Sequence, residues 1–438
     1  MSNFIKISNK INDYNKTIYV SGDKSLSIRW VLFSSMAKGK SMATNLLLSE
    51  DVLAAINAIK KLGISVKLKK NHCTIVGNGP DGYKYKKNII INSKNSGTLG
   101  RLIMGILVDT PHKIKITGDK SLSKRDFKRI ADPLSKFGAR IKLTKKGLPL
   151  TIVGSKNLHS IKYVENRGSA QVKSSIILAG LKTEGKTIIK AKKSRNHTEL
   201  LCKHLDLPVK VKRVKNYEII EVQKAKKIKP LNYKIPSDIS SGSFFIVLTA
   251  LSNNSKLVIK NININPSRIG IITILKKMGV VIEFKNQQNY KGEIIADILI
   301  KSSKKLKAIN CPTKLNSGAI DEFLVIFLVA AKAHGISYFK NISELNQKES
   351  PRLKWGTKIL NKMGIKTITT DSSIKIFGNP NLKINKKIVI KNFLKDHRVF
   401  MTSVIAALSF GGTWDIYDKD SINTSFPSFL TKLNNLVK

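Results

Sequence analysis

The sequence predicts an α/β protein made of two similar domains, each containing three copies of one repeated unit. Three observations predict this class. One pattern of roughly 70–80 residues recurs along the chain, which is typical of repeat architectures. Helix-like and strand-like segments alternate within every copy, as they do in α/β folds. The chain has 438 residues, of which 42% are hydrophobic, and this suits roughly two to three domains with large cores.

Every copy of the repeat has the same order of parts. A polar motif opens it, and an apolar helix, a turn at Gly, a β-rich run, a second helix and a β-hairpin follow. In the first copy these parts are the motif Lys24-Ser25, the helix 27–37, the turn Lys38-Gly39-Lys40, the second helix 51–62 and the strands 64–68 and 73–76.

The other five copies follow the same order. Their opening motifs are Asn95-Ser96-Gly97-Thr98, Ser169-Ala170-Gln171, Ser240-Ser241-Gly242, Ser317-Gly318 and Asp396-His397-Arg398. Further first helices are expected at 172–181, 321–333 and 399–410, and further second helices at 126–137, 267–278, 351–363 and from His197 to before Pro208. Gly63, Gly138, Gly279 and Gly364 follow second helices, where a left-handed residue ends a helix.

Two segments are candidates for the connection between the domains. Pro230 and Pro236 bracket a short polar stretch, and the segment before Gly22 lies outside the first copy. We therefore expect the first three-repeat domain to span residues 20–235. Residues 1–19 and 236–438 would form the second three-repeat domain, and a two-segment hinge would join the two.

The composition excludes several classes of protein. Three cysteines, Cys73, Cys202 and Cys311, with no C-x-x-C spacing, fit neither a disulfide framework nor a zinc ribbon. The longest apolar runs, such as 323–331, are far shorter than the roughly 20 residues of a membrane helix. Residues 1–10 lack the apolar core of a signal peptide. These features predict a cytoplasmic protein that does not insert into membranes.

The charge balance has three readings. The chain carries 79 Lys and Arg against 28 Asp and Glu, a formal charge of +51. A polyanion-binding face would explain it, yet the lysines are spread over the whole chain and the few aromatics do not alternate with them. Lys enriched together with Ile and Asn is also what an AT-rich coding sequence produces. The third reading is a locally positive cleft for small anionic substrates.

The opening motifs are candidate anion sites. Each precedes the first turn of an apolar helix, where free N–H groups and the positive end of the helix dipole attract anions. Cations gather at the motifs as well, which suits two or three anionic groups held by bidentate Arg. These cations are Lys24, Arg29, Arg101, Arg125, Arg195, Lys348, Arg352 and Arg398.

Acids inside the motifs are candidate proton-transfer groups because acids are scarce in this chain. Asp321 precedes Glu322 at the fifth first helix, and Glu349 lies between Lys348 and Arg352. A carboxylate between cations stays ionised and can accept a proton when substrate arrives. Each also has a structural reading: Asp321 as an N-cap, Glu349 as half of an ion pair. His397 could be catalytic or a hydrogen-bonded structural residue.

Other motif residues read as ligands. Ser25, Ser169 and Gln171 suit phosphate or hydroxyl groups. The sequence contains no Ser-His-Asp arrangement, no metal-ligand cluster and no Walker loop. We therefore expect no metal and no cofactor.

The sequence resembles the 5-enolpyruvylshikimate-3-phosphate synthase (3-phosphoshikimate 1-carboxyvinyltransferase) family. The matching stretches run in the family order across nearly the whole chain. They are Gly22-Asp23-Lys24-Ser25-Leu26-Ser27-Ile28-Arg29, Asn95-Ser96-Gly97-Thr98 with Arg101, Gly118-Asp119-Lys120-Ser121-Leu122-Ser123-Lys124-Arg125, Ser169-Ala170-Gln171-Val172-Lys173-Ser174, Arg195-Asn196-His197-Thr198-Glu199, Ile320-Asp321-Glu322, Lys348-Glu349-Ser350 with Arg352, and Asp396-His397-Arg398. The stretches 169–174 and 195–199 of the third repeat resemble those of the branch that includes glyphosate-tolerant bacterial enzymes.

The resemblance implies a fold and an activity. The fold would be two inside-out, barrel-like α/β domains of three βαβαββ units each. The activity would be transfer of the enolpyruvyl group of phosphoenolpyruvate to the 5-hydroxyl of shikimate 3-phosphate, with release of phosphate, in the shikimate pathway. The partners would be these two small anionic substrates, with no nucleic acid and no membrane, and the protein would be a monomer.

The resemblance also implies roles for the motif residues. Shikimate 3-phosphate would contact Lys24, Ser25, Arg29, Ser169, Ala170, Gln171, Arg195, Asp321 and Lys348. Phosphoenolpyruvate would contact Lys24, Asn95, Gly97, Arg125, Gln171, Arg352 and Arg398. Asp321 would take the proton from the attacking hydroxyl, and Glu349, with Lys24, would protonate the methylene carbon.

Four positions depart from the family pattern. Asp126 replaces a usual Pro, Pro351 a usual Asp and Asn346 a usual Arg, while Thr424 stands where one branch has a Lys. Pro351 is compatible with the first turn of a helix.

Two alternatives remain. One is the sister enzyme that acts on UDP-N-acetylglucosamine, although 118–125 lacks the Cys expected there. The other is a polyanion-binding protein on a degenerate enzyme scaffold, although Lys24, Arg125, Asp321 and Glu349 are all present.

Overall fold

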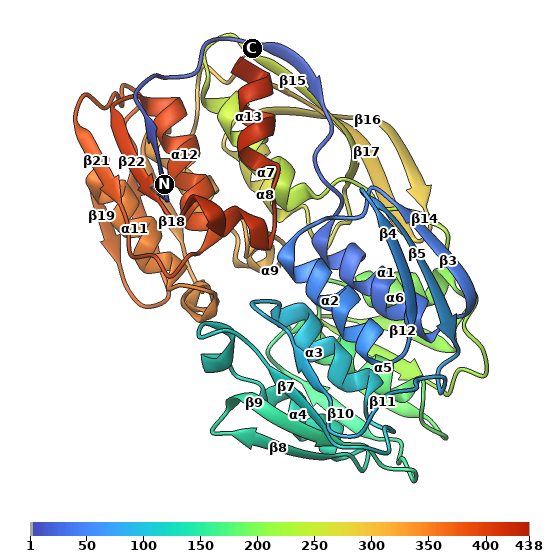
Figure 1. The fold of residues 1–438 in the computed structure, drawn as a ribbon. Coiled ribbons are helices and arrows are strands. Elements are labelled where there is room, and N and C mark those ends of the chain that lie inside the picture. The colour runs from blue at the N-terminus through green and yellow to red at the C-terminus, as the bar shows by residue number, and fades with distance from the viewer. Residues whose placement is uncertain (1–2, 438) are drawn as a thin grey trace. The chain divides into compact units, whose positions relative to one another are not determined.

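The computed structural model describes residues 3–437 and divides into two compact units (Figure 1). Unit 1 contains residues 1–21, 236–289 and 294–438, and unit 2 contains residues 22–235 and 290–293. Each unit has its own hydrophobic core. The chain therefore passes between the units at residues 21–22 and 235–236, and again on both sides of the four-residue segment Tyr290–Glu293.

Unit 2 contains three four-stranded sheets with one common topology. In each, an edge strand pairs in parallel with the next strand and the other two pair antiparallel. The sheets are β14(Tyr233–Lys234)-β3(Lys38–Thr44)-β5(His72–Asn78)-β4(Ser65–Lys69), β6(Ile90–Asn92)-β7(Ile114–Thr117)-β9(Gly147–Val153)-β8(Arg140–Thr144) and β10(Lys162–Glu165)-β11(Thr187–Lys192)-β13(Tyr217–Val222)-β12(Val209–Val214).

Two helices accompany each of these sheets. The inner helices are α1 (Lys24–Met36), α3 (Gly97–Ile106) and α5 (Ala170–Gly180), and the outer helices are α2 (Glu50–Lys61), α4 (Lys128–Ser135) and α6 (His197–His204), with a short 3-10 helix at Leu122–Lys124. Helix α3 contacts both α1 and α5. The repeat that the sequence predicts is therefore one sheet with one inner and one outer helix.

Unit 1 repeats this plan with a permuted start. Its sheets are β16(Val281–Tyr290)-β17(Glu293–Lys301)-β15(Lys256–Asn263)-β2(Asn15–Ile18), β18(Ile336–Phe339)-β20(Ile374–Phe377)-β19(Thr367–Thr369) and β1(Phe4–Ile7)-β22(Thr413–Tyr417)-β21(Lys387–Ile390). The N-terminal strands β1 and β2 thus complete two sheets of the second half of the chain. This explains why the unit is discontinuous in sequence.

The helices of unit 1 follow the same division. The inner helices are α7 (Ile239–Leu251), α10 (Phe323–Lys332) and α12 (His397–Phe410), and they contact one another. The others are α8 (Gly270–Lys277), α9 (Asn316–Ala319), α11 (Arg352–Lys362) and α13 (Phe429–Val437), with 3-10 helices at Thr313–Leu315, Ser343–Gln347 and Lys419–Thr424.

The inner helices make both units inside-out α/β structures. Every residue of α7 is buried, and α1 is buried from Leu26 to Met36. A helix that is apolar on all sides must be surrounded by other elements, and here the sheets and outer helices surround it. The α/β class predicted from the sequence is confirmed, because both units consist of small mixed sheets with helices.

Polar side chains cap five of the six inner helices. Asp23, Ser96, Ser169, Asp238 and Asp396 accept hydrogen bonds from backbone N–H groups of the first turns of α1, α3, α5, α7 and α12. Such caps satisfy donors that have no partner inside the helix. Five of the opening motifs therefore coincide with the starts of inner helices, as the sequence predicts, whereas Ser317-Gly318 lies in the separate short helix α9 before α10.

Several element boundaries differ from the sequence prediction. The expected turn Lys38-Gly39-Lys40 is the start of β3, which pairs with β5. Helix α4 begins at Lys128 instead of 126, because Arg125 is extended and the Asp126 carboxylate accepts from the Arg129 N–H. Asp321 precedes α10, which begins at Phe323.

The predicted glycine stops are confirmed for four second helices. Gly63, Gly138, Gly279 and Gly364 all have positive φ. The third copy uses Asp206, with φ 53°, after the short helix α6. Asp tolerates the left-handed region better than most residues, so this copy needs no Gly.

Candidate active site

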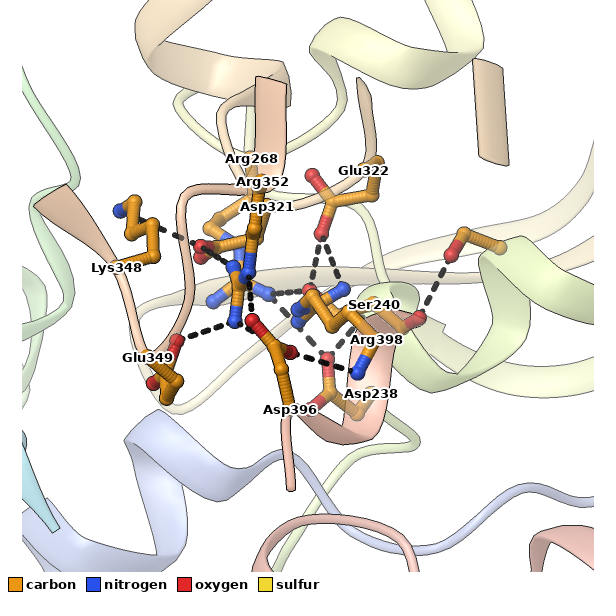
Figure 2. A network of polar contacts seen from close by, with 11 residues as sticks. Asp238, Ser240, Arg268, Asp321, Glu322, Lys348, Glu349, Arg352, Asp396 and Arg398 are labelled. Atoms are coloured by element: carbon orange, nitrogen blue, oxygen red, sulfur yellow. Dashed lines mark hydrogen bonds and ion pairs between the residues drawn. The ribbon is translucent and has the colours of Figure 1, made fainter. Parts of the chain in front are cut away.

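Arg352 is the centre of a buried polar cluster in unit 1 (Figure 2). It is the first residue of α11. Its Nε and Nη2 donate to the two oxygens of Asp396 at 2.9 and 3.3 Å, Nη1 donates to Asp321 at 3.3 Å, and Nη2 also donates to Glu349. One guanidinium group therefore holds three carboxylates.

The three carboxylates change the proton affinity of this cluster. Burial works against the charged form of Arg352, but Asp396, Glu349 and Asp321 outweigh it and raise its pKa. Burial would likewise raise the pKa of Asp396, but Arg352 overrides this and holds it below the usual range. Both groups of this pair therefore remain charged at neutral pH.

Asp321 lies between two cations. Its Oδ1 is 3.4 Å from Nζ of Lys348 and 3.3 Å from Arg352. The side chain is 17% exposed, so a substrate hydroxyl can reach it. Asp321 and Glu349, the two acids predicted from the sequence, are thus both bound to Arg352 in the same cluster.

A second set of polar contacts surrounds Arg398. The Glu322 carboxylate accepts from the Ser240 hydroxyl and lies 3.6 Å from Nη1 of Arg398. Arg268 donates to the Ser240 hydroxyl at 2.6 Å and to Asp238 at 3.3 Å. These residues start α7, α10 and α12, so the contacts join the N-terminal ends of the three inner helices of unit 1 (Figure 2).

The His397 ring contacts one of the positions that depart from the family pattern. Its Nδ1 lies 3.2 Å from the Thr424 hydroxyl, which donates to the backbone of Ser421. The ring is buried at the start of α12. A structural, hydrogen-bonded role accounts for these contacts.

Unit 2 contains a second candidate cluster, around Gln171 in the first turn of α5. The Gln171 side chain accepts from Arg101 Nη1 at 2.6 Å and donates to Thr98 at 3.1 Å. An ideal Cβ at Gly97 would lie 2.9 Å from Arg101 Nη1 and 3.0 Å from Arg125 Nη1. The two guanidinium groups therefore lie against the backbone of the Gly97 motif.

The remaining motif residues of unit 2 take part in local contacts. Lys24 forms an ion pair with Asp51 at 2.9 Å. Asn95 donates to Asp119 at 2.6 Å. Ser169 caps α5, and Glu165 accepts from its N–H at 3.0 Å.

Arg29 joins α1 to the starts of α5 and α6. Its Nε donates to Thr198 at 2.8 Å and Nη2 donates to Ser174 at 3.2 Å. Burial lowers the pKa of Arg29 to about 10, and Glu199 is the strongest of the nearby charges that oppose this effect. Arg29 still carries its charge at neutral pH. At Arg29 the effect of burial on the pKa outweighs that of the nearby acids, whereas at Arg352 the acids outweigh burial.

Lys173 is a buried cation near the predicted site residues, and the sequence analysis did not identify its ion pairs. It is fully buried in α5 and forms ion pairs with Glu199 of α6 at 2.6 Å and Glu218 of β13 at 3.0 Å. These pairs fix α5 against α6, so they position Ser169, Gln171 and Arg195. A lysine within an apolar helix was a usable signal, because buried charges are normally paired.

The predicted site residues fall into two groups. Unit 2 contains Lys24, Ser25, Arg29, Asn95, Gly97, Arg125, Ser169, Ala170, Gln171 and Arg195, and unit 1 contains Asp321, Lys348, Glu349, Arg352 and Arg398. Within each unit they gather at the starts of helices. Asp396 and Asp51, which pair with Arg352 and Lys24, were not among the predicted site residues.

Within residues 3–437, no group of three or more His, Cys, Asp and Glu side chains could hold a metal ion. No helix of this part of the chain is both long and apolar enough to cross a membrane.

Solved structures define the class of fold. The enolpyruvyl transferase NikO of Streptomyces tendae superposes with a TM-score of 0.78, covering 99% of this chain and 97% of that chain, at 14% identity. At this identity the likeness shows the fold alone. The chain therefore has the enolpyruvyl transferase fold.

Closer relatives define the family. A family model described as EPSP synthase (3-phosphoshikimate 1-carboxyvinyltransferase) matches residues 8–433. The 3-phosphoshikimate 1-carboxyvinyltransferase of Caldicellulosiruptor bescii is 37% identical over 418 residues, 95% of both chains. That of Bacillus cytotoxicus is 37% identical over 425 residues, 96% of this chain and 98% of the relative. The EPSP synthase of Acinetobacter baumannii superposes with a TM-score of 0.87 at 36% identity, covering 100% and 98% of the two chains.

The chain belongs to the EPSP synthase family. It is accordingly a transferase of the shikimate pathway of aromatic amino-acid biosynthesis, of the class 3-phosphoshikimate 1-carboxyvinyltransferase (EC 2.5.1.19).

The buried Lys173 ion pairs predict a large stability effect. Lys173→Met leaves Glu199 and Glu218 buried without their cation, and breaking such a pair costs about 3–5 kcal/mol. The free energy of unfolding, measured by urea titration, should fall by this amount. Lys186→Met is the matched control, because Lys186 pairs with Glu221 of the same strand at 3.2 Å but is 51% exposed. Loss of this exposed pair should lower the free energy of unfolding by at most about 1 kcal/mol. Equal losses for the two variants would contradict a special stabilising role of the buried Lys173 ion pairs.

Proposed function

We propose that this chain transfers the enolpyruvyl group by addition and elimination, with Asp321 and Glu349 as its proton-transfer groups. The 5-hydroxyl oxygen of shikimate 3-phosphate attacks C2 of phosphoenolpyruvate while C3 gains a proton. The tetrahedral adduct then loses phosphate from C2 and a proton from C3, which regenerates the double bond. The observation that carries the proposal is that Arg352 forms ion pairs with both acids, Asp321 and Glu349.

Asp321 is suited to the role of base. Lys348 and Arg352 lie within 3.4 Å of its Oδ1, and nearby cations keep a carboxylate ionised. It accepts the proton of the 5-hydroxyl as that oxygen attacks C2. Since a general base must be within hydrogen-bond reach of the proton it removes, Asp321 also orients the hydroxyl.

Glu349 is suited to proton transfer at the methylene carbon. It is three residues before Arg352 and 16% exposed, so it can reach a substrate while the guanidinium holds its orientation. Glu349 acts together with Lys24, an ammonium group paired with Asp51: the two supply the proton that C3 gains on addition and take one back on elimination.

The two substrates are assigned to overlapping sets of motif residues. Shikimate 3-phosphate binds to Lys24, Ser25, Arg29, Ser169, Ala170, Gln171, Arg195, Asp321 and Lys348. Phosphoenolpyruvate binds to Lys24, Asn95, Gly97, Arg125, Gln171, Arg352 and Arg398. Support comes from the capped helix starts at these positions, where backbone N–H groups and the helix dipole favour anions.

The organisation of the working protein is part of the proposal. Residues 20–235 form one domain and residues 1–19 with 236–438 the other, joined by a two-segment hinge. The protein acts as a cytoplasmic monomer on small anions, without nucleic acid or membrane as partner. The excess of Lys over acids then reflects mainly codon composition.

Phosphate release tests the reaction. Purified protein with phosphoenolpyruvate should release phosphate only when shikimate 3-phosphate is also present. Release with UDP-N-acetylglucosamine instead would assign the protein to the sister activity. If neither acceptor led to phosphate release and the protein were retained on DNA in a salt-dependent way, the polyanion-binding alternative would be favoured.

Loss of the base should affect turnover more than binding. Asp321→Ala is expected to lower kcat about 10²–10⁴-fold, the usual contribution of general acid–base catalysis, with much smaller changes in KM. Asp371→Ala is a matched control in unit 1, because Asp371 is an exposed residue outside the cluster. An equal loss in kcat and in substrate affinity would point to a purely binding role for Asp321.

The branch within the family is also a proposal. The motifs Ser169–Ser174 and Arg195–Glu199 place the chain near glyphosate-tolerant bacterial enzymes, yet Gly97 stands where tolerant enzymes often have Ala. A methyl group at Gly97 would crowd Arg101 and Arg125, within about 3 Å of both. We expect millimolar glyphosate to inhibit the natural protein and to inhibit Gly97→Ala less. Unchanged activity of the natural protein in millimolar glyphosate would refute this.

A further inference from the structure

The tip of the β16–β17 hairpin belongs to a different unit from its strands. Residues Tyr290–Glu293 are part of unit 2, whereas the rest of the hairpin is part of unit 1. The two central residues, Lys291 and Gly292, have φ of 49° and 87°, as in a tight two-residue hairpin turn. The chain thus contributes a short, rigid turn to unit 2 from a distant part of the sequence.

The turn is fixed to unit 2 by packing on both sides. The ring of Tyr290 stacks on Tyr233, with centroids 5.6 Å apart and planes within 6°, and its hydroxyl accepts from the Lys234 N–H at 3.0 Å. An ideal Cβ at Gly292 would lie 2.6 Å from the Leu200 carbonyl oxygen of α6. Only Gly permits this close approach, so the turn and α6 are tightly joined.

Glu293 forms a buried polar contact with His197 at this turn. Its Oε1 lies 2.6 Å from Nδ1 of His197, and the two side chains are 2% and 1% exposed. The other ring nitrogen of His197, Nε2, is buried and has no hydrogen-bond partner among residues 3–437. Among polar contacts, therefore, Glu293 alone determines the orientation of the ring.

His197 is located where its orientation affects two proposed ligands of shikimate 3-phosphate. It is the first residue of α6, and Arg195 precedes it by two residues. The next residue, Thr198, accepts from Nε of Arg29 and bonds to Ser174 at 2.8 Å. A displacement of the first turn of α6 would thus move Arg195 directly and Arg29 through Thr198.

Charge interactions agree with this geometry. Burial is the largest effect on the pKa of Arg29 and lowers it. Glu199, Asp23 and Glu293, in decreasing order, act to raise this pKa, and Arg195 acts to lower it. The hairpin carboxylate is thus within electrostatic reach of the guanidinium group that is proposed to bind the substrate anion.

We propose that Glu293 is a positioning residue for shikimate 3-phosphate: its hydrogen bond to His197 fixes the first turn of α6 and so the directions of Arg195 and Arg29. Glu293 need not touch the substrate. The inference rests on the proposed assignment of Arg29 and Arg195 to shikimate 3-phosphate. It adds a residue that lies outside all the sequence motifs.

Binding of shikimate 3-phosphate without phosphoenolpyruvate, measured by titration calorimetry, tests the proposal. Glu293→Ala and His197→Phe remove the same hydrogen bond from its two ends, and each should raise the Kd about tenfold, the equivalent of one charge-assisted hydrogen bond. The double variant should be no weaker than the worse single variant, because both act on one contact. Additive losses would overturn the proposal.

A conservative variant separates positioning from loss of folding. Glu293→Gln keeps an oxygen that can accept from Nδ1–H, so it should restore the Kd to within about twofold of the natural protein. In steady-state assays, Glu293→Ala should raise KM for shikimate 3-phosphate while kcat at saturation changes by less than about twofold. If Gln weakens binding as much as Ala, hydrogen-bond positioning is refuted.

Two further variants make each result decisive. Tyr290→Phe loses the hydroxyl that binds Lys234 but keeps the stacked ring, so it should leave the Kd unchanged; a tenfold loss there would mean that the turn acts only through general stability. Arg195→Ala tests the underlying assignment and should also weaken binding. If it does and Glu293→Ala does not, the positioning proposal alone fails. If Arg195→Ala binds normally, the assignment of Arg195 and the proposal both fail.

Discussion

The burial of six inner helices on all sides is the constraint on which the rest of the structure depends. Helices such as α7 and α1 offer almost no polar face, so each unit must place its sheets and outer helices around them. Polar groups then gather mainly where helices begin. Polar side chains cap five of the inner helices, while Arg125, Arg195 and Arg352 lie just before or at the starts of the outer helices α4, α6 and α11.

Two buried arginines show how differently the units use charge. Arg352 is held by three carboxylates, and its charged form is strongly favoured. Arg29 is held by two hydroxyl groups and a carbonyl, and burial lowers its pKa to about 10. Arg29 is therefore held by neutral groups, whereas Arg352 fixes the orientation of Asp321 and Glu349. Any contact of Arg352 with phosphoenolpyruvate has to compete with these acids.

The sequence predicted what depends on local pattern. The repeat, the apolar helices and the glycine stops follow from spacing, and the scarcity of acids singled out Asp321 and Glu349 as candidates. The partners of buried charges could not be predicted, because they lie far apart in sequence: Arg352 and Asp396 are 44 residues apart, Lys173 and Glu218 are 45, and His197 and Glu293 are 96. Only the folded sheets bring such pairs together.

The departures from the family pattern can be judged by the bonds they make. Pro351 caps α11 with φ −71°, where its missing N–H has no role, and its carbonyl accepts from Trp355. Asp126 accepts from the Arg129 N–H at the start of α4 and pairs with Arg167. Asn346 donates to the Asp371 carbonyl at 3.4 Å. Pro351 needs no N–H at its position, and Asp126 accepts a hydrogen bond in the first turn of α4. Helix α11, which begins at Arg352, and helix α4, which follows Arg125, therefore both form without the usual residues at positions 126 and 351.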